Sequence, residues 1–189
     1  MAAIAAAALV VAGYLALTKL AGGSAAFCSS GGGCDAVQSS RYATMLRLPT
    51  AFWGALAYAA VGGLAAAGLT TSRWVWAFAI AAGAVGFSAY LTWLEVFVIK
   101  ALCGYCLVSA GLAVVLLAAL VWRRPAAGGK RSPVRAGRLV GVGLGAAVAT
   151  IVVGAGIFAG NVESLDPVYQ AALARHLAER GIIMYGGFT

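Results

Sequence analysis

Four cysteines occur as two closely spaced pairs, and they are the residues of this chain best suited to chemistry. The first pair, Cys28 and Cys34, lies in the stretch FCSSGGGCDAVQSSRYA. The glycine run 31–33 between the two cysteines gives the backbone the freedom that a small disulfide ring requires. A flexible ring of this kind can be opened and closed again, so the first pair is predicted to be redox-active.

The second pair, Cys103 and Cys106 in LCGYCL, has Cys-x-x-Cys spacing and opens a long apolar stretch. This spacing places both sulfurs on one side of a helix, with Cβ atoms about 5–6 Å apart. A helix that begins near Lys100 would put both cysteines in its first turns. Free backbone N–H groups and the helix dipole stabilise a thiolate there. The second pair is therefore predicted to exchange reversibly.

The depth of the second pair indicates its reaction partner. At a rise of about 1.5 Å per residue, its sulfurs would lie roughly 4–9 Å along the helix axis from the membrane interface. Water-soluble oxidants reach that depth poorly, whereas a quinone dissolved in lipid reaches it easily. Two thiols deliver two electrons, which matches the reduction of a quinone to a quinol. We expect the second pair to face a quinone and the first pair to face proteins that carry thiols.

Other uses of four cysteines stay open at this point. Cys-x-x-Cys is also a metal-knuckle spacing, and four cysteines can hold zinc in a tetrahedron. Such a site would place a charged centre at the edge of the lipid, and no histidine lies close in sequence. Two structural disulfides, or thiols that only pack, are further alternatives. The competing function from a different class is a membrane protein that binds or transports a soft metal, zinc or copper, with the same thiols.

The elements that must position these cysteines are transmembrane helices. Apolar residues make up 63% of the chain and charged residues 10%, a composition that excludes an ordinary water-soluble domain. A spanning helix needs about 20 mostly apolar residues. Five segments satisfy this length: 1–21, 49–69, 74–99, 101–122 and 139–160. The predicted fold class is an all-α integral membrane protein.

A cluster of basic residues sets the predicted orientation. Six of the 13 Lys and Arg residues lie in the loop 123–138, namely Arg123, Arg124, Lys130, Arg131, Arg135 and Arg138. Short basic loops remain in the cytoplasm, so the N-terminus is predicted inside and the tail after Gly160 outside. Alternation then places all four cysteines on or near the outer face. The stretch SAAFC could be a signal-peptidase site, but the run before it lacks a basic start, so a retained helix is expected.

The tail changes character after Gly160. A good N-cap followed by proline, and a glycine at the far end, predict an external linker helix over residues 161–181. Residues 182–189 resemble a strand without a partner, which is not stable alone. The expected organisation is a catalytic bundle over 1–122, a basic cytoplasmic loop over 123–138, a fifth transmembrane helix over 139–160, the external linker helix, and the stub of a further domain.

At the cysteines and their surroundings, the chain resembles the vitamin K epoxide reductase family in its bacterial form. The matching features are Cys28-x5-Cys34 with the following CDAVQSSRYA, the proline-led LPTAFWGALAY, and Cys103-Gly-Tyr-Cys106 at the start of the fourth segment. The final MYGGFT is similar to the first strand of the thioredoxin-like domain that bacterial members often carry after a fifth helix. The resemblance thus extends over the whole chain, and we expect a chain cut before that domain's own Cys-x-x-Cys.

The resemblance implies a four-helix bundle around a quinone, with the outer loop over the pocket and a peripheral fifth helix. It implies that Cys106 interacts with ubiquinone or menaquinone, that Cys103 exchanges with Cys34, and that Cys28 meets a thioredoxin-like partner or fused domain on the outer face. Electrons would pass from the partner through a Cys34–Cys103 mixed disulfide to the second pair. The implied function is a thiol oxidoreductase of the bacterial cytoplasmic membrane that supports disulfide formation in exported proteins.

Two further residues are assigned to the quinone site. Ser40 lies at the loop-serine position of the family, although a helix-cap serine would look the same. Phe87 on the third segment could flank a quinone ring, although such an aromatic more often packs or faces lipid. Ala110 stands where the animal enzymes have a tyrosine that touches vitamin K, so reduction of a plain quinone is expected rather than epoxide reduction. Glu95 could be catalytic, because intramembrane acids are often functional, but it is expected to reach the outer interface or pair with Lys100, outside the site.

Overall fold

The computed structural model describes residues 1–163, apart from 24, 27, 29–31 and 126–135. Its helices are α1 (Ala2–Leu20), α2 (Gly33–Ser39), α3 (Thr50–Ala66), α4 (Thr71–Trp93), α5 (Gly104–Trp122) and α6 (Ala136–Glu163). A 3-10 turn (Arg41–Ala43) and an antiparallel hairpin, β1 (Thr44–Met45) and β2 (Leu48–Pro49), connect α2 to α3. The stub 182–189, most of the predicted linker helix and most of the basic loop lie outside the described residues.

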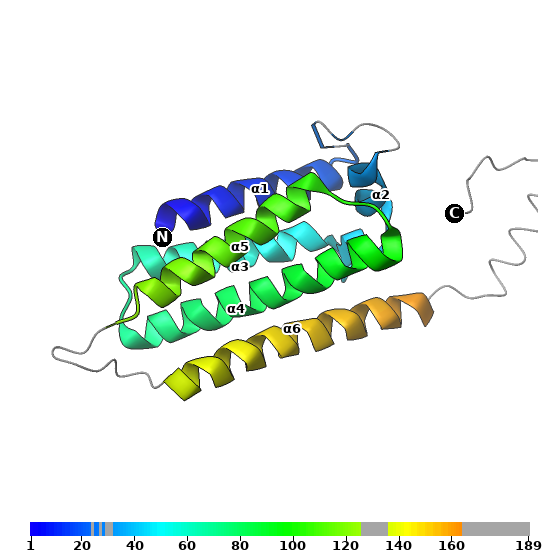
Figure 1. The fold of residues 1–189 in the computed structure, drawn as a ribbon. Helices are drawn as coiled ribbons and strands as arrows, with labels where there is room; N and C mark the ends of the chain where they lie inside the picture. The colour runs from blue at the N-terminus through cyan, green and yellow to red at the C-terminus, as the bar shows by residue number, and fades with distance from the viewer. Residues whose placement is uncertain (24, 27, 29–31, 126–135, 164–189) are drawn as a thin grey trace, which may run out of the picture.

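Helices α1, α3, α4 and α5 form a bundle, and α6 lies along α4 on its outer side (Figure 1). Four helices of the described chain are long and apolar enough to cross a membrane: α1, α4 with its extension to Ile99, α5, and α6 over Gly137–Gly160. Helix α3 is apolar but has 17 residues, which is at the short end of the spanning range. The predicted all-α membrane fold is confirmed.

Small residues let the helices approach closely. Trp74 is fully buried in the bundle core, and its indole N–H donates a hydrogen bond to the Leu120 carbonyl at 3.0 Å. Between α4 and α6, a Cβ atom at Gly86 would lie 2.7 Å from Ala147, so glycine is required there. Helices in lipid associate by van der Waals packing, and close small-residue contacts of this kind supply it.

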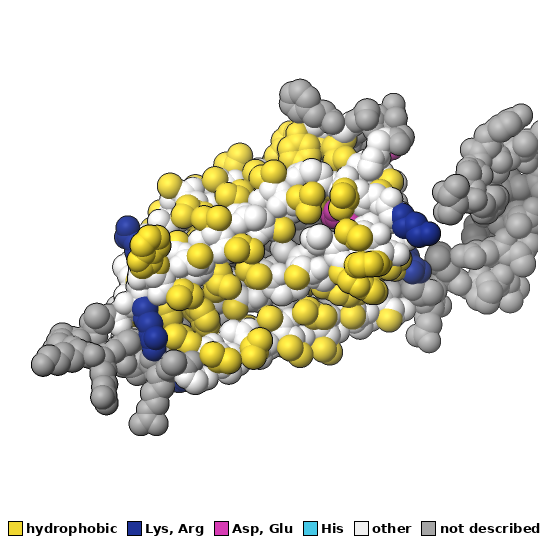
Figure 2. Space-filling model, viewed as in Figure 1, with side chains coloured by type: hydrophobic (Ala, Val, Ile, Leu, Met, Phe, Trp, Pro, Cys, Tyr) yellow, Lys and Arg dark blue, Asp and Glu magenta, His cyan; other side chains and the backbone are white. Residues whose placement is uncertain are grey.

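Large apolar side chains cover the outside of the bundle, while Lys and Arg side chains gather toward its two ends (Figure 2). Exposed apolar residues occur on several helices, including Leu17, Trp76, Val115 and Val148. This distribution suits a lipid-facing belt between two polar surfaces. The chain is therefore a multi-pass membrane protein.

The junction between α4 and α5 differs from the prediction. Helix α4 continues into a π-helical segment, Leu94–Ile99, and Lys100 ends it in the left-handed conformation with φ of 56°. The next helix begins at Gly104, and Cys103 is its N-cap. The predicted start near Lys100 is therefore wrong by about one turn. A continuous apolar run cannot reveal a short non-helical connection, whose backbone is bent by tertiary contacts rather than by residue type.

Candidate active site

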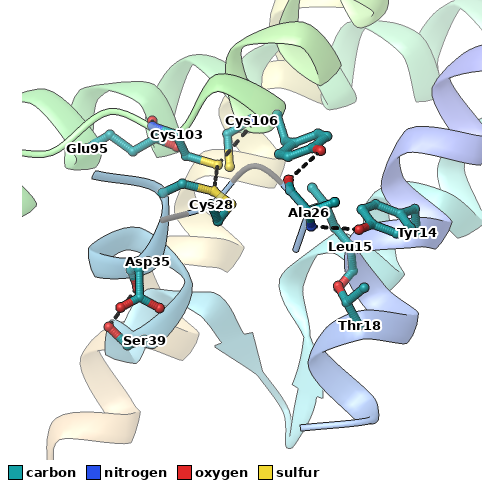
Figure 3. The surroundings of a disulfide bond; sticks show 12 residues. Tyr14, Leu15, Thr18, Ala26, Cys28, Asp35, Ser39, Glu95, Cys103 and Cys106 are labelled. Atoms are coloured by element: carbon teal, nitrogen blue, oxygen red, sulfur yellow. Dashed lines mark hydrogen bonds between the residues drawn. A yellow bond between two sulfur atoms is a disulfide. The ribbon is translucent and has the colours of Figure 1, made fainter. Parts of the chain in front are cut away.

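The structure brings the two cysteine pairs together. Cys28 and Cys34 form a disulfide with Cα atoms 5.5 Å apart, and Cys34 lies in the first turn of α2. Cys103 and Cys106 are free thiols at the start of α5. The Sγ atoms of Cys34 and Cys103 are 3.8 Å apart, so the disulfide touches the inner pair (Figure 3). A small movement at this contact would allow exchange between the two pairs.

The two inner thiols lie on either side of the start of α5, with Cys103 at the N-cap and Cys106 in the first turn. Cys103 is fully buried, and its sulfur accepts a hydrogen bond from the Cys106 backbone N–H at 3.4 Å. Free N–H groups at a helix N-terminus favour a negative charge, which suits a sulfur that must become a thiolate. The backbone of Cys103 is extended rather than helical. The pair therefore straddles the helix start, where a disulfide can close with little disturbance of the helix.

A close backbone contact positions the disulfide against this helix start. Gly33 is the first residue of α2, and a Cβ atom there would lie 2.7 Å from the Leu102 carbonyl oxygen and 3.2 Å from the Leu102 nitrogen. Only glycine allows the two backbones to approach this closely. The residues that follow Gly33 and Leu102 are Cys34 and Cys103. The contact therefore sets the distance between the two pairs.

Gly33→Ala is expected to slow electron transfer between the pairs by about 10- to 100-fold, because the added methyl group pushes α2 away from Leu102. The rate is measured by reducing the outer pair, quenching with acid at successive times and quantifying free thiols at each cysteine by mass spectrometry. Gly111→Ala is the matched control, since a Cβ atom there meets nothing within 4 Å. Equal rates for Gly33→Ala and the unmodified protein would show that this contact does not position the pairs.

Glu95 is placed differently from the sequence-based expectation. Its side chain is 2% exposed, whereas Lys100 is exposed at the end of the π-helical segment. The carboxylate oxygen Oε2 accepts the Cys103 backbone N–H at 3.0 Å. The side chain is therefore turned into the protein rather than outward as expected, and it lies at the candidate site. Its presence in an apolar span was the signal that could have indicated this, because intramembrane acids are usually functional.

A cavity of about 520 Å³ lies inside the bundle and is bordered by Cys106. Its size falls within the range of about 300–1,000 Å³ that small-molecule sites occupy. Its lining is mainly apolar and comes from α1, α3, α4, α5, α6 and the segment before α3. The cavity reaches Cys106, while Cys103 touches the outer disulfide. The inner pair thus connects the outer disulfide with the cavity.

Both residues assigned to a quinone site line this cavity. The Ser40 hydroxyl donates to the Val37 carbonyl at 2.7 Å at the end of α2, so it also has the capping role that the sequence allowed. The Phe87 ring stacks on Phe158 of α6, with ring centroids 6.5 Å apart. Their roles toward a ligand stay predictions.

Helix α6 supplies part of the cavity wall, which the sequence did not indicate. Ala149, Thr150, Val153 and Gly154 all line the cavity. A Cβ atom at Gly154 would lie 2.5 Å from the Phe87 ring, so this glycine makes room for the ring. Helix α6 therefore packs at the edge of the bundle and still lines the cavity that Cys106 borders.

The described part of the chain contains no set of side chains that would serve the competing function, a bound metal ion. Cys28 and Cys34 are joined to each other. Among the described residues, no group of three or more His, Cys, Asp or Glu side chains is arranged to hold a metal ion. The four cysteines instead lie as one disulfide and one pair of free thiols that touch through Cys34 and Cys103.

A comparison with known protein families agrees with this arrangement. Residues 1–122 match the model of the vitamin K epoxide reductase family. The matched range contains α1 to α5 and all four cysteines. It also contains most of the residues that line the cavity, the exceptions being those of α6.

Proposed function

Because the chain belongs to the vitamin K epoxide reductase family and is a membrane thiol oxidoreductase, we propose that it oxidises a thioredoxin-like protein or fused domain and passes the electrons to a quinone. The observation that carries this proposal is the 3.8 Å contact between Cys34 and Cys103. This contact joins a disulfide to a thiol pair that borders an apolar cavity. In a cell the activity would support disulfide formation in exported proteins.

The proposed relay consists of thiol–disulfide exchanges. A partner thiolate attacks Cys28 and releases Cys34, and the second partner thiol then releases Cys28 as the partner's own disulfide forms. Cys34 attacks Cys103 of the oxidised inner pair and releases Cys106. Attack of Cys28 on Cys34 then closes the outer ring and leaves both inner thiols reduced. Two electrons have then moved inward, which leaves the outer pair as a disulfide and the inner pair as thiols.

The cavity suits the head group of a quinone. Its apolar walls match the ring, and hydroxyl groups such as those of Ser40 and Thr50 can donate to quinone oxygens. When bound, a quinone supplies the two-electron acceptor that the inner thiols require. We propose that Phe87 contacts the ring and that Ser40 redirects its hydroxyl from Val37 toward a quinone oxygen. Both ubiquinone and menaquinone fit this description.

We also propose an orientation in a bacterial cytoplasmic membrane, with the N-terminus in the cytoplasm. The basic loop 123–138 supports this orientation through its positive charge. The loop follows the end of α5 opposite to Cys103, so the cysteines would lie toward the outer face. In this arrangement, residues 1–122 form the catalytic bundle, and the chain after residue 160 leads toward a thioredoxin-like partner.

The proposal predicts quinol formation by purified protein. The chain is mixed in detergent with a reduced thioredoxin-like protein and with ubiquinone or menaquinone, and quinol is followed by absorbance. We expect steady quinol formation, with Cys103→Ala no faster than a sample without protein. Folded protein that binds quinone but forms no quinol would overturn the proposal. Stoichiometric zinc or copper in such a sample would favour the metal-binding function instead.

A further inference from the structure

Glu95 is a buried acid inside a membrane-spanning helix. It is the only Asp or Glu among the described residues that is fully enclosed, with 2% of its surface exposed. It lies in the π-helical segment Leu94–Ile99 and borders the same cavity as Cys106. An ionisable group in this setting is costly to keep, and π-helical turns recur at functional sites.

Several contacts fix the Glu95 carboxyl group beside the inner thiols (Figure 3). One carboxylate oxygen accepts the Cys103 backbone N–H at 3.0 Å. The Cys106 side chain lies close enough to interact with the carboxyl group, and both residues border the same cavity. The main-chain oxygen of Glu95 accepts the Ala101 N–H at 3.0 Å, which folds the connection to α5 back toward Glu95. The carboxyl group is thus held at the start of α5 and borders the same cavity as the Cys106 thiol.

The surroundings of Glu95 require that its carboxyl group and the neighbouring cysteine thiol are not both deprotonated. Cys103 and Cys106 are the titratable groups that interact with its carboxyl group. Tyr42 and Tyr58 also line the cavity, and no Lys, Arg, His or Asp of the described chain does so. A carboxylate and a thiolate in contact repel strongly where the dielectric constant is low. The two groups therefore hold at least one proton between them.

We propose that Glu95 is a catalytic residue that takes the proton of the Cys106 thiol and passes it to a quinone oxygen, an inference that rests on the proposed function. In the overall step, two S–H bonds break and the Cys103–Cys106 bond forms, while the quinone gains two electrons and two protons. One of those protons passes through the Glu95 carboxylate, which is regenerated. The other is the proton that the Cys103 thiol loses.

Glu95→Gln tests this role because it keeps the shape and the oxygen that accepts the Cys103 N–H, but it cannot carry a proton. Pre-reduced protein is mixed with quinone in detergent and a single turnover is followed. The quinone step is expected to slow by about 10²–10⁴-fold, the usual range for general acid–base catalysis. Exchange between Cys34 and Cys103, measured by acid quenching, is expected to keep its normal rate. Glu163→Gln, the same change at the last residue of α6, is the matched control.

Two further measurements separate proton transfer from a structural role. The quinone step should accelerate as the pH rises through the titration of Glu95, because only the carboxylate can take the thiol proton. Glu95→Gln should lack this rise, and Glu95→Asp should keep it at a lower rate. Without quinone, the infrared difference spectrum between oxidised and reduced protein should contain a carboxyl band, and Glu95→Gln should remove it.

Each outcome bears on a separate claim. Unchanged turnover and an unchanged pH profile in Glu95→Gln, with an active unmodified protein, would overturn the Glu95 role and leave the proposed function intact. Loss of both quinone reduction and Cys34–Cys103 exchange would assign Glu95 a structural role and also overturn the inference. Should Glu95→Gln fail to fold, Glu95→Asp decides: a retained rise with pH supports the role, and a flat profile overturns it. Unmodified protein that forms no quinol would overturn both proposals.

Discussion

Cys106→Ser is expected to reduce quinol formation to the level without protein, while the Cys28–Cys34 disulfide still forms. Cys106 is the cysteine that borders the cavity, and a serine hydroxyl can neither join a disulfide nor give up electrons. The outer disulfide lies in α2 and the loop before it, so the geometry of the ring does not depend on this side chain, and an added disulfide oxidant can close it without the inner pair. The expected result is a protein that can accept electrons from its partner but cannot deliver them inward as a pair.

The measurement combines quinol absorbance with mass spectrometric mapping of the disulfides in the same sample. Val114→Ala is a suitable control, because it removes methyl groups from an exposed position on the same helix. It is expected to leave both readouts unchanged. Full turnover by Cys106→Ser would remove Cys106 from the relay, and loss of the outer disulfide would indicate a folding defect rather than a missing electron carrier.

The sequence predicted the features that depend on local spacing and composition. Apolar length located the long helices, and α1, α3, α4, α5 and α6 each overlap a predicted segment, whereas the short helix α2 was not predicted. The spacing of Cys103 and Cys106 marked a redox pair at a helix start, although the helix itself begins at Gly104. These features can be predicted without knowing the fold, because the length of an apolar segment and the spacing of two cysteines are read directly from the sequence.

The features that the sequence did not predict depend on contacts between distant residues. Glu95 turns inward because a π-helical segment replaces the regular helix before Lys100, and a period of 3.6 residues cannot anticipate that change. Gly33 meets the backbone of Leu102 across a long stretch of sequence. A glycine in a glycine-rich loop looks flexible in the sequence, yet here it is required for close approach.

The participation of α6 in the cavity was hidden for a similar reason. The glycine-rich pattern of this helix indicated a spanning segment but not its neighbour. In the structure, Gly86 of α4 and Gly154 of α6 allow the two helices to interlock, with Phe87 lying over Gly154. The shape of the cavity therefore depends on the contact between Phe87 and Gly154, and this contact is known only once the helices are placed side by side.

Cys28→Ala is expected to accumulate protein in which Cys34 is bonded to Cys103. Without Cys28, the Cys34 thiolate still attacks the oxidised inner pair at Cys103 and releases Cys106, but the thiol that would attack Cys34 and complete the transfer is missing. In the structure the two sulfurs are already 3.8 Å apart, and a disulfide of about 2.0 Å needs an approach of less than about 2 Å. Peptide mapping under non-reducing conditions, after thiols are blocked in acid, is expected to show Cys34–Cys103 as the main disulfide.

The trapped bond also tests the direction of the relay, because it fixes which inner cysteine meets the outer pair. Cys103 touches Cys34 and lies away from the cavity lining, so a bond from Cys34 to Cys106 should stay rare. The double variant Cys28→Ala, Cys103→Ala is the matched control, and it should leave Cys34 unbonded. Finding Cys34 entirely free in Cys28→Ala, with Cys103 present, would contradict the relay. Finding it bonded to Cys106 would preserve a relay but reverse the roles of the two inner thiols.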